Sequence, residues 1–238
     1  QDADANRLHY NWPMHIPDGF IDVQTSAVFA GLAAAGIATA LKGARTQLDE
    51  KTAPLAGLTA VFIFAVQMLN FPVVAGTSGH LLGGALAAVL VGPWAATLAL
   101  TVVLLMQGLL FADGGLTAIG LNVFNMGVLG VWAGYGIFLL LRKLLPKNKS
   151  SISVAAALGG LLSVPAAAVG FTIQYAMGAT ATFSTSAVLS AMVGTHVLIG
   201  IGEALITGLT VSAVLASRSD LVYGWKNNKQ KLEIRSAN

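Results

Sequence analysis

The chain has no cysteine and very little charge. Only 10% of its 238 residues are charged, against roughly 25% in soluble domains, whereas 55% are hydrophobic. The lack of cysteine excludes disulfides and thiolate metal sites. The sequence contains no GxxxxGK[ST] nucleotide motif, no HExxH protease motif and no basic patch that would suit nucleic acid. These absences, together with 27 glycines that lie mainly in apolar runs, predict an integral membrane protein rather than a soluble enzyme.

The apolar runs predict an all-α protein, a bundle of about seven transmembrane helices. A helix needs roughly 20 apolar residues to cross a bilayer, so the third run is too short to cross unaided. The predicted helices are Val23–Leu41, Pro54–Leu69, His80–Val91, Pro93–Phe111, Ala118–Leu141, Val154–Met177 and Thr185–Ala216. The chain then divides into an N-terminal segment at 1–22, a transmembrane domain at 23–216 and a tail at 217–238.

The distribution of positive charge predicts the orientation of the bundle. Cytoplasmic segments of membrane proteins are enriched in Lys and Arg. If the N-terminus lies outside and the C-terminus inside, every Lys and Arg except Arg7 falls on the inner side. The outer side then gathers imidazoles and carboxylates, namely His9, His15, His80, Asp2, Asp4, Asp18, Asp22 and Asp113. A divalent cation that arrives from outside would meet this surface first.

His15 and His80 are the candidate metal ligands that the residues alone suggest. Neutral imidazole suits nickel, cobalt, copper and zinc. The Gly and Pro residues of "FPVVAGTSGHLLGG", 71–84, allow a re-entrant loop, which is tolerated at membrane depth where it lines a cavity. The alternative is two unrelated surface histidines that cap helices or bond carbonyls, because two imidazoles make an incomplete site.

Four motifs resemble signatures of the CbiM/NikM family. They are "MHIPDGF" (14–20), "GTSGHLLGG" (76–84), "FADGGLTAIGLNVFNMG" (111–127) and "HVLIGIGEALITG" (196–208), in the order of the family. Members are the metal-specific substrate-binding (S) components of energy-coupling-factor transporters for cobalt and nickel. The resemblance implies a non-enzymatic subunit of the cell (inner, cytoplasmic) membrane that captures Co(II) or Ni(II) as its transported substrate at the outer face. No organic cofactor is implied.

The resemblance also implies partners. These are a transmembrane scaffold (T) subunit, two ATPase subunits on the cytoplasmic side and a small accessory membrane subunit, all within the lipid bilayer and without nucleic acid. Ala30, Ala34 and Ala38 recur every four residues along the first predicted helix, and small residues at that spacing permit close helix contact. This stripe is a candidate docking face for the scaffold, and packing within the chain explains it equally well.

The ligand set that the resemblance implies contains only nitrogen. Met14 supplies its α-amine, His15 its amide nitrogen and imidazole, and His80 a second imidazole. Planar nitrogen ligands favour Ni(II), which tilts the expected substrate slightly toward nickel over cobalt.

This chain departs from the pattern at Met14. Residues 1–13 precede it, so its nitrogen belongs to a peptide bond rather than to an amine. Processing could free Met14, or residues 1–13 could be absent from the working protein. Alternatively, His9 or Asp18 could replace the amine. The first two explanations are slightly favoured.

Further polar residues have expected roles around this site. Asp18 is expected to orient His15 or its loop, or to form an Asx turn in "PDG". His196 is a candidate partner of a metal ligand, and Asn122 is expected to bond across helices. Asp113 could attract cations, although a turn or helix-cap role is the stronger expectation.

Glu203 is predicted to lie deep in the last helix, with His196 on the same helical face. An ionisable residue at this depth suggests function. The competing hypothesis is therefore a self-sufficient ion carrier or channel that uses Glu203 and His196 as a proton or ion path. A structural role, with Asn122, Asn125 or Gln107 as hydrogen-bond partners of Glu203, is the favoured interpretation. A hydrolase is the least favoured function.

Overall fold

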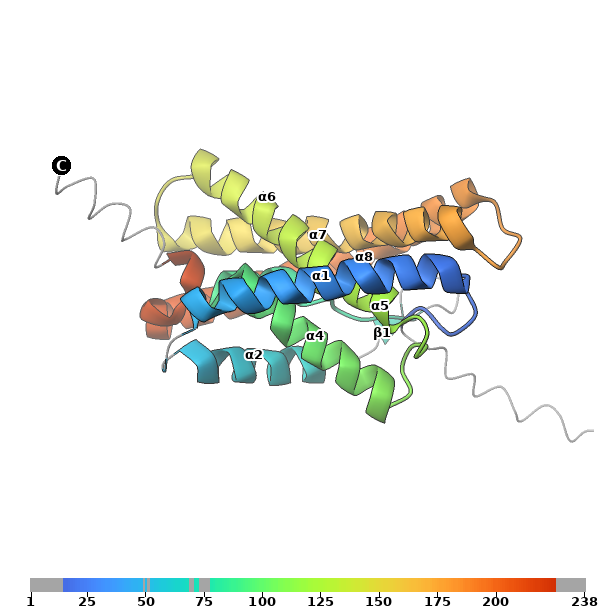
Figure 1. The fold of residues 1–238 in the computed structure, drawn as a ribbon. Coiled ribbons are helices and arrows are strands. Elements are labelled where there is room, and N and C mark those ends of the chain that lie inside the picture. Colours follow the sequence, from blue (N-terminus) through green and yellow to red (C-terminus); the bar gives the residue numbers. More distant parts are fainter. Residues whose placement is uncertain (1–14, 49, 51, 69–70, 73–77, 226–238) are drawn as a thin grey trace, which may run out of the picture.

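The computed structural model describes residues 15–48, 50, 52–68, 71–72 and 78–225, which form a bundle of helices with one short strand pair (Figure 1). In chain order the elements are α1 (Val23–Gln47), α2 (Thr52–Gln67), β1 (Phe71–Pro72), β2 (Ser78–Gly79), α3 (Gly84–Val91), α4 (Pro93–Leu110), α5 (Ile119–Asn122), the π-helix η1 (Val123–Gly130), α6 (Val131–Leu144), α7 (Lys149–Gly178), α8 (Thr185–Arg218) and the 3-10 helix η2 (Ser219–Leu221). The strands β1 and β2 pair antiparallel.

Polar residues cap the N-termini of three long helices, just before the apolar runs begin. The carboxylate of Asp22 accepts a hydrogen bond from the backbone N–H of Thr25 at 2.7 Å, at the start of α1. Asn148 and Ser184 make equivalent caps on α7 and α8. Such a cap satisfies one of the backbone N–H groups that the first turn leaves unpaired. Proline at the first position of α4 removes such a group instead.

The all-α class is confirmed, and each predicted helical range contains helix. Among the described residues, five helices are long and apolar enough to cross a membrane, namely Val23–Gln47, Pro93–Leu110, Ile119–Leu144, Lys149–Gly178 and Thr185–Leu221, while α2 is shorter. The predicted boundary at His80 is wrong, because His80–Gly83 is not helical and α3 begins at Gly84. The predicted helix Ala118–Leu141 is one continuous run that changes to a π-helix over 123–130.

The short helix α3 lies inside the bundle. All of its residues are buried, and it packs against α2, α4, α6 and α7. Protein therefore surrounds the segment that is too short to cross a bilayer. On the outside of the bundle, large apolar side chains such as Val102, Leu205 and Leu209 are more than half exposed, as expected of a surface that faces lipid.

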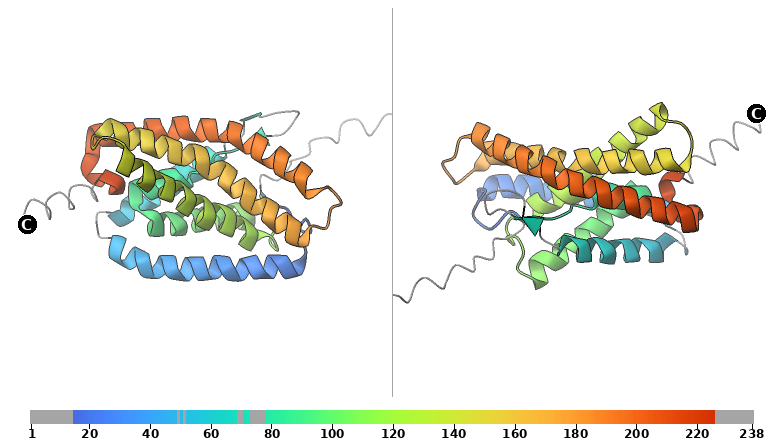
Figure 2. Two further views of the ribbon diagram at one scale, coloured as in Figure 1. Left: turned by 90° about the horizontal axis from the view of Figure 1, so that it is seen from above. Right: turned by 180° about the vertical axis from the view of Figure 1, so that it is seen from behind.

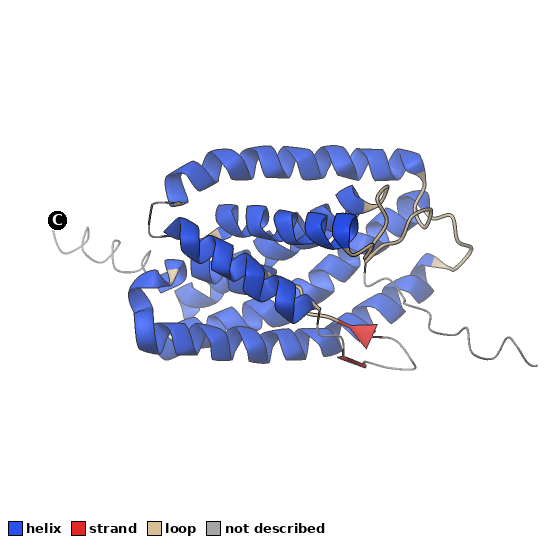
Figure 3. Cartoon of the chain, turned by 90° about the horizontal axis from the view of Figure 1, so that it is seen from below, coloured by secondary structure: helices blue, strands red, loops and turns tan. Residues whose placement is uncertain are grey.

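The two ends of the bundle differ in charge. The described Lys and Arg gather where α1 and α6 end, α7 begins and α8 ends; they are Lys42, Arg45, Arg142, Lys143, Lys147, Lys149 and Arg218. Loops at the opposite end include residues 15–22, 111–118 and 179–184 (Figures 2 and 3). The charged residues described in these three loops are Asp18, Asp22 and Asp113. The candidate site lies at this acidic end.

Candidate metal centre

The fold brings His15 and His80 together from distant parts of the chain. Their ring centroids lie 4.9 Å apart, with 50° between the ring planes. Both residues are buried, at 7% and 8% exposure. Metal–nitrogen bonds are about 2.0–2.1 Å long, so two imidazoles at right angles on one ion would have centroids roughly 4.5 Å apart. The two rings are therefore placed as neighbouring ligands of a single ion would be.

The backbone sets the tautomer of His80. Its Nδ1 lies 2.9 Å from the carbonyl oxygen of Leu81. A carbonyl oxygen can only accept, so Nδ1 is the nitrogen that carries the proton. In the neutral ring the lone pair is then on Nε2, which is the form of imidazole that binds a metal.

His15 contacts the carboxylate of Asp113, a pair that was not predicted from the sequence. Its Nδ1 lies 3.2 Å from Oδ2 of Asp113, in a contact that does not have the geometry of a hydrogen bond. The Nε2 of His15 is buried and has no hydrogen-bond partner in the described part of the chain. Buried polar atoms are usually hydrogen-bonded. This nitrogen is therefore free to bind a metal ion.

Asn122 fixes the backbone directly after His15. Its side-chain oxygen accepts from the N–H of Ile16 at 3.1 Å, and its side-chain nitrogen donates to the Ile16 carbonyl at 3.3 Å. The N–H of Gly115 donates to the same carbonyl at 2.9 Å. Asn122 was expected to bond across helices, and its partner is instead the backbone of the His15 loop.

Glycine is required where the 112–117 loop passes under His15. Gly114 has φ +94°, and a Cβ there would lie 2.8 Å from Cβ of His15 and 3.2 Å from Nδ2 of Asn122. A Cβ on Gly115 would collide with the backbone of Asp18. The "DGG" sequence thus combines the carboxylate that contacts His15 with the two positions at which a side chain would not fit.

Asp18 anchors the loop rather than the His15 ring. Its Oδ1 accepts from the backbone N–H of Thr117 at 2.7 Å and from the Thr117 hydroxyl at 2.6 Å. These donors stabilise the charged carboxylate and lower the pKa of Asp18 below its usual value. Asp18 was expected to orient either His15 or its loop, and these hydrogen bonds support the role in the loop.

The start of the α7–α8 connection holds the other side of the His15 loop. The N–H of Asp22 donates to the carbonyl of Gly178 at 2.7 Å, and Ile21 forms a bridge with Ala179. The hydroxyl of Thr180 donates to the carbonyl of Gly19 at 2.7 Å. Residues 15–22 are therefore held by contacts with His80, with residues 113–122 and with residues 178–180.

The described residues supply two imidazoles but not a complete ligand set. Within this part of the chain, no three His, Cys, Asp or Glu side chains are grouped so that they could hold an ion. Met14 and His9, two of the residues considered as further ligands, lie outside the described residues.

Comparisons with known proteins identify a family for this chain. The model of the CbiM family, described as the cobalt uptake substrate-specific transmembrane region, matches residues 15–221. The chain belongs to the CbiM family.

Two relatives of this CbiM-family chain are similar to it over nearly their whole length. The cobalt transport protein CbiM of Sorangium cellulosum is 33% identical, over 88% of this chain and 94% of its own. A protein of Haloquadratum walsbyi that is provisionally named as a metal transport protein is 39% identical, over the same shares of the two chains. The crystal structure of a truncated transition metal transporter is 34% identical, with a TM-score of 0.78 over 85% of this chain and 99% of its own.

Glu203 has different hydrogen-bond partners from those that the sequence predicted. Its carboxylate accepts from the backbone N–H groups of Leu82 and Gly83, at 2.9 and 2.8 Å, and not from the side chains of Asn122, Asn125 or Gln107. Those side chains bond elsewhere: Asn122 to Ile16, Asn125 to Gln174 and Gln107 to Gln67. The expected partners were wrong because unpaired backbone N–H groups of the non-helical segment cannot be recognised from side-chain types.

His196 is bonded within its own helix. Its Nδ1 lies 2.7 Å from the carbonyl of Met192, one turn earlier in α8. This contact provides a structural explanation for His196, whose expected role beside a metal ligand stays a prediction. Asp113, for which a turn or cap was the stronger expectation, is the functional candidate that the sequence reasoning undervalued. The "DGG" sequence on the same predicted side as His15 was the available signal.

Proposed function

We propose that this CbiM-family chain is the metal-specific, substrate-binding membrane subunit of an ATP-dependent energy-coupling-factor importer for Co(II) or Ni(II). The observation that carries the proposal is the convergence of His15 and His80, with 4.9 Å between their rings, at the acidic end of the bundle. Nitrogen ligands of this type suit both ions. Relatives that are named as cobalt and nickel transport proteins support a transporter rather than an enzyme.

The orientation follows from charge. The described Lys and Arg lie at the end of the bundle opposite His15, and cytoplasmic segments are enriched in these residues. We therefore place the acidic end outside the cell membrane, with about seven helices in the bilayer, so that the ion is captured at the outer face. An ATPase on the inner side and a membrane scaffold subunit would then act on a chain that itself lacks a nucleotide-binding motif.

The remaining ligands are proposed to come from the residues directly before His15. The amide nitrogen of His15 and the nitrogen of Met14 would complete a planar nitrogen set with the two imidazoles, and such a set favours Ni(II). The buried Nε2 of His15, which has no hydrogen-bond partner among the described residues, supports an ion at this position.

Titration of the purified protein with Ni(II) and Co(II) tests the proposal. His15→Ala and His80→Ala should each abolish tight binding, because each removes an imidazole from the site. Asn125→Ala is the matched control, since its side chain is bonded to Gln174 on α7, and it should bind like the wild type. A chain that begins at Met14 should bind more tightly than one that begins at Gln1 if the Met14 amine is a ligand.

Normal binding by both His15→Ala and His80→Ala would refute the proposed site. Uptake of metal into vesicles that contain this chain alone, without ATPase subunits, would refute the proposed ATP-dependent mechanism and favour a self-sufficient carrier.

A further inference from the structure

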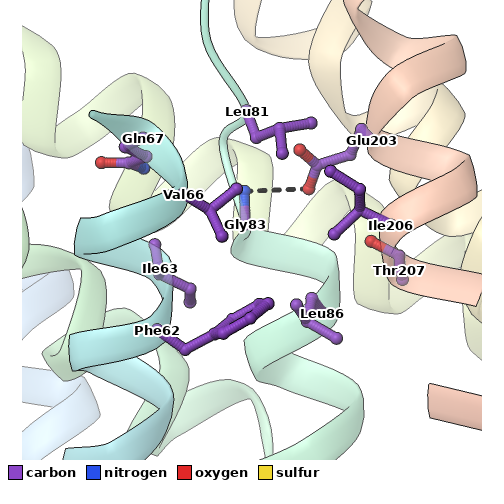
Figure 4. Close-up of a pocket in the computed structure, with 10 residues that line it drawn as sticks. All are labelled: Phe62, Ile63, Val66, Gln67, Leu81, Gly83, Leu86, Glu203, Ile206 and Thr207. Atoms are coloured by element: carbon purple, nitrogen blue, oxygen red, sulfur yellow. Dashed lines mark hydrogen bonds between the residues drawn. The ribbon is translucent and has the colours of Figure 1, made fainter. Parts of the chain in front are cut away.

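Glu203 is a buried carboxylate whose hydrogen bonds lead toward the candidate metal centre. It lies in the middle of α8 with 1% exposure. Figure 4 shows its side chain directed at the start of α3, where Oε1 accepts from the N–H of Gly83 at 2.8 Å. The second oxygen, Oε2, accepts from the N–H of Leu82 at 2.9 Å. Both carboxylate oxygens are thus used on the segment that directly follows His80.

One peptide group connects Glu203 with the His80 ring. The peptide bond between Leu81 and Leu82 has its N–H on Oε2 of Glu203 and its C=O on Nδ1 of His80, at 2.9 Å each. The N–H and C=O of a trans peptide point in opposite directions within one plane. Carboxylate, peptide and imidazole are therefore hydrogen-bonded in series, and a rotation of this peptide would break both bonds.

The series has a chemical consequence for His80. Hydrogen bonds in a chain polarise one another, so an anion on the peptide N–H strengthens the carbonyl at the other end as an acceptor. A stronger acceptor on Nδ1–H fixes the tautomer and raises the basicity of the opposite ring nitrogen. In metal sites a carboxylate often performs this function by direct contact with the histidine. Here one peptide group separates the two.

Helix α2 holds the next peptide group, between Leu82 and Gly83, through its carbonyl oxygen. The side-chain nitrogen of Gln67 donates to the carbonyl of Leu82 at 2.7 Å, and Gln107 donates to the oxygen of Gln67 at 2.9 Å. With Glu203 on the N–H and Gln67 on the carbonyl, Leu82 is fixed between α8 and α2. The non-helical segment His80–Gly83 therefore has a single well-defined path.

We propose that Glu203 is a positioning residue of the metal centre, which orients and activates His80 through the Leu81–Leu82 peptide. The inference rests on the proposed function, in which His80 binds Co(II) or Ni(II). It assigns Glu203 to the binding site rather than to a proton path or to helix packing alone.

Glu203→Gln tests this assignment in the full chain. The substitution keeps the shape of the side chain but replaces one acceptor oxygen by an NH₂ group, so either Leu82 or Gly83 loses its partner. The affinity for Ni(II) or Co(II), measured by calorimetric titration, should fall by about 10- to 100-fold, as for other outer partners of metal ligands. The d–d absorption bands of the bound ion should shift, because the His80 nitrogen becomes a weaker donor.

Two further variants separate positioning from stability. Thr207→Val changes a buried residue one turn further along α8. Thr207 lines, with Glu203 and Gly83, the pocket drawn in Figure 4, and its substitution should leave affinity and spectrum unchanged even if the protein unfolds at a lower temperature. Glu203→Asp keeps both acceptor oxygens on a shorter side chain, so its affinity should lie between those of the wild type and Glu203→Gln. If Glu203→Gln does not fold, the affinity of Glu203→Asp is compared with that of the wild type instead.

The inference is overturned if the folded Glu203 variants bind the ion with the affinity and spectrum of the wild type. Failure of the proposed function gives a different result, in which the wild type itself binds neither ion or His80→Ala binds normally.

Discussion

Asn122 provides a direct test of how the His15 loop is held. Its side chain is 6% exposed and makes two hydrogen bonds to one residue, accepting from the N–H of Ile16 and donating to its carbonyl. Asn122→Ala removes both bonds without touching either imidazole. A net contribution of about 0.5–1.5 kcal/mol for each hydrogen bond gives roughly 1–3 kcal/mol for the pair.

This free energy should be measurable as metal affinity. Ile16 directly follows His15, so a loop without the two bonds must be ordered again each time the ion binds. A change of 1.4 kcal/mol corresponds to a factor of ten in the dissociation constant, so roughly 1–3 kcal/mol predicts a rise of about 5- to 150-fold. Calorimetric titration with Ni(II) or Co(II) covers this range, and thermal unfolding without metal measures the loss of stability separately.

Asn125→Ala is the matched control for Asn122→Ala. Asn125 lies three residues further along the same helical run, is 5% exposed and also makes two reciprocal bonds, to Gln174 at 2.8 and 3.0 Å. Both variants should lower the unfolding temperature, and only Asn122→Ala should weaken binding. Equal losses of affinity in the two variants, or wild-type affinity in Asn122→Ala, would show that the clamp on Ile16 does not support the site.

Two further predictions concern the same loops. Gly114→Ala should weaken metal binding, because the new Cβ would displace His15. Gly19→Ala is its control: Gly19 has φ +75°, but no atom lies within 4 Å of the new Cβ. This variant should therefore show only the backbone strain of about 1–2 kcal/mol, measured as a lower unfolding temperature. Asp18 has a lowered pKa in the folded protein, so its contribution to stability is present above the usual value of 3.8 and is lost as the pH falls through the lowered pKa. Thermal unfolding across this acid range should therefore show a steeper loss for the wild type than for Asp18→Asn, and equal slopes would contradict the Thr117 anchor.

The helices could be predicted from the sequence because their signals are local. Long apolar runs, the proline that starts α4 and the polar residues between runs predict where the helices lie. The predicted start of α3 at His80 was wrong, because the helix begins only after Gly83, whose φ of +77° is not helical. Glu203 of α8 and Gln67 of α2 hold the non-helical His80–Gly83 segment, and such long-range hydrogen bonds cannot be read from the pattern of one segment.

The two central histidines could also be predicted, whereas most of their supports could not. Motif resemblance and charge pointed to His15 and His80, because a ligand must be a particular residue type. A supporting residue can be any polar group that reaches the right atom. Asp113 reaches the His15 ring and Glu203 reaches a peptide next to His80, and both contacts depend on tertiary structure.

The residues that hold His15 and His80 in place act in a similar way, because the two proposed ligands lie outside the helices. Neither His15 nor His80 is in a helix, so neither has a ladder of local hydrogen bonds to hold its backbone. A metal centre tolerates displacements of only about 0.5 Å. That precision has to come from distant groups, which act on residues shortly after each proposed ligand: Asn122 on Ile16, and Glu203 with Gln67 on Leu82. Substitutions at these positions should therefore reduce metal affinity by more than substitutions of equally buried polar residues such as Asn125, whose bonds connect one helix to another.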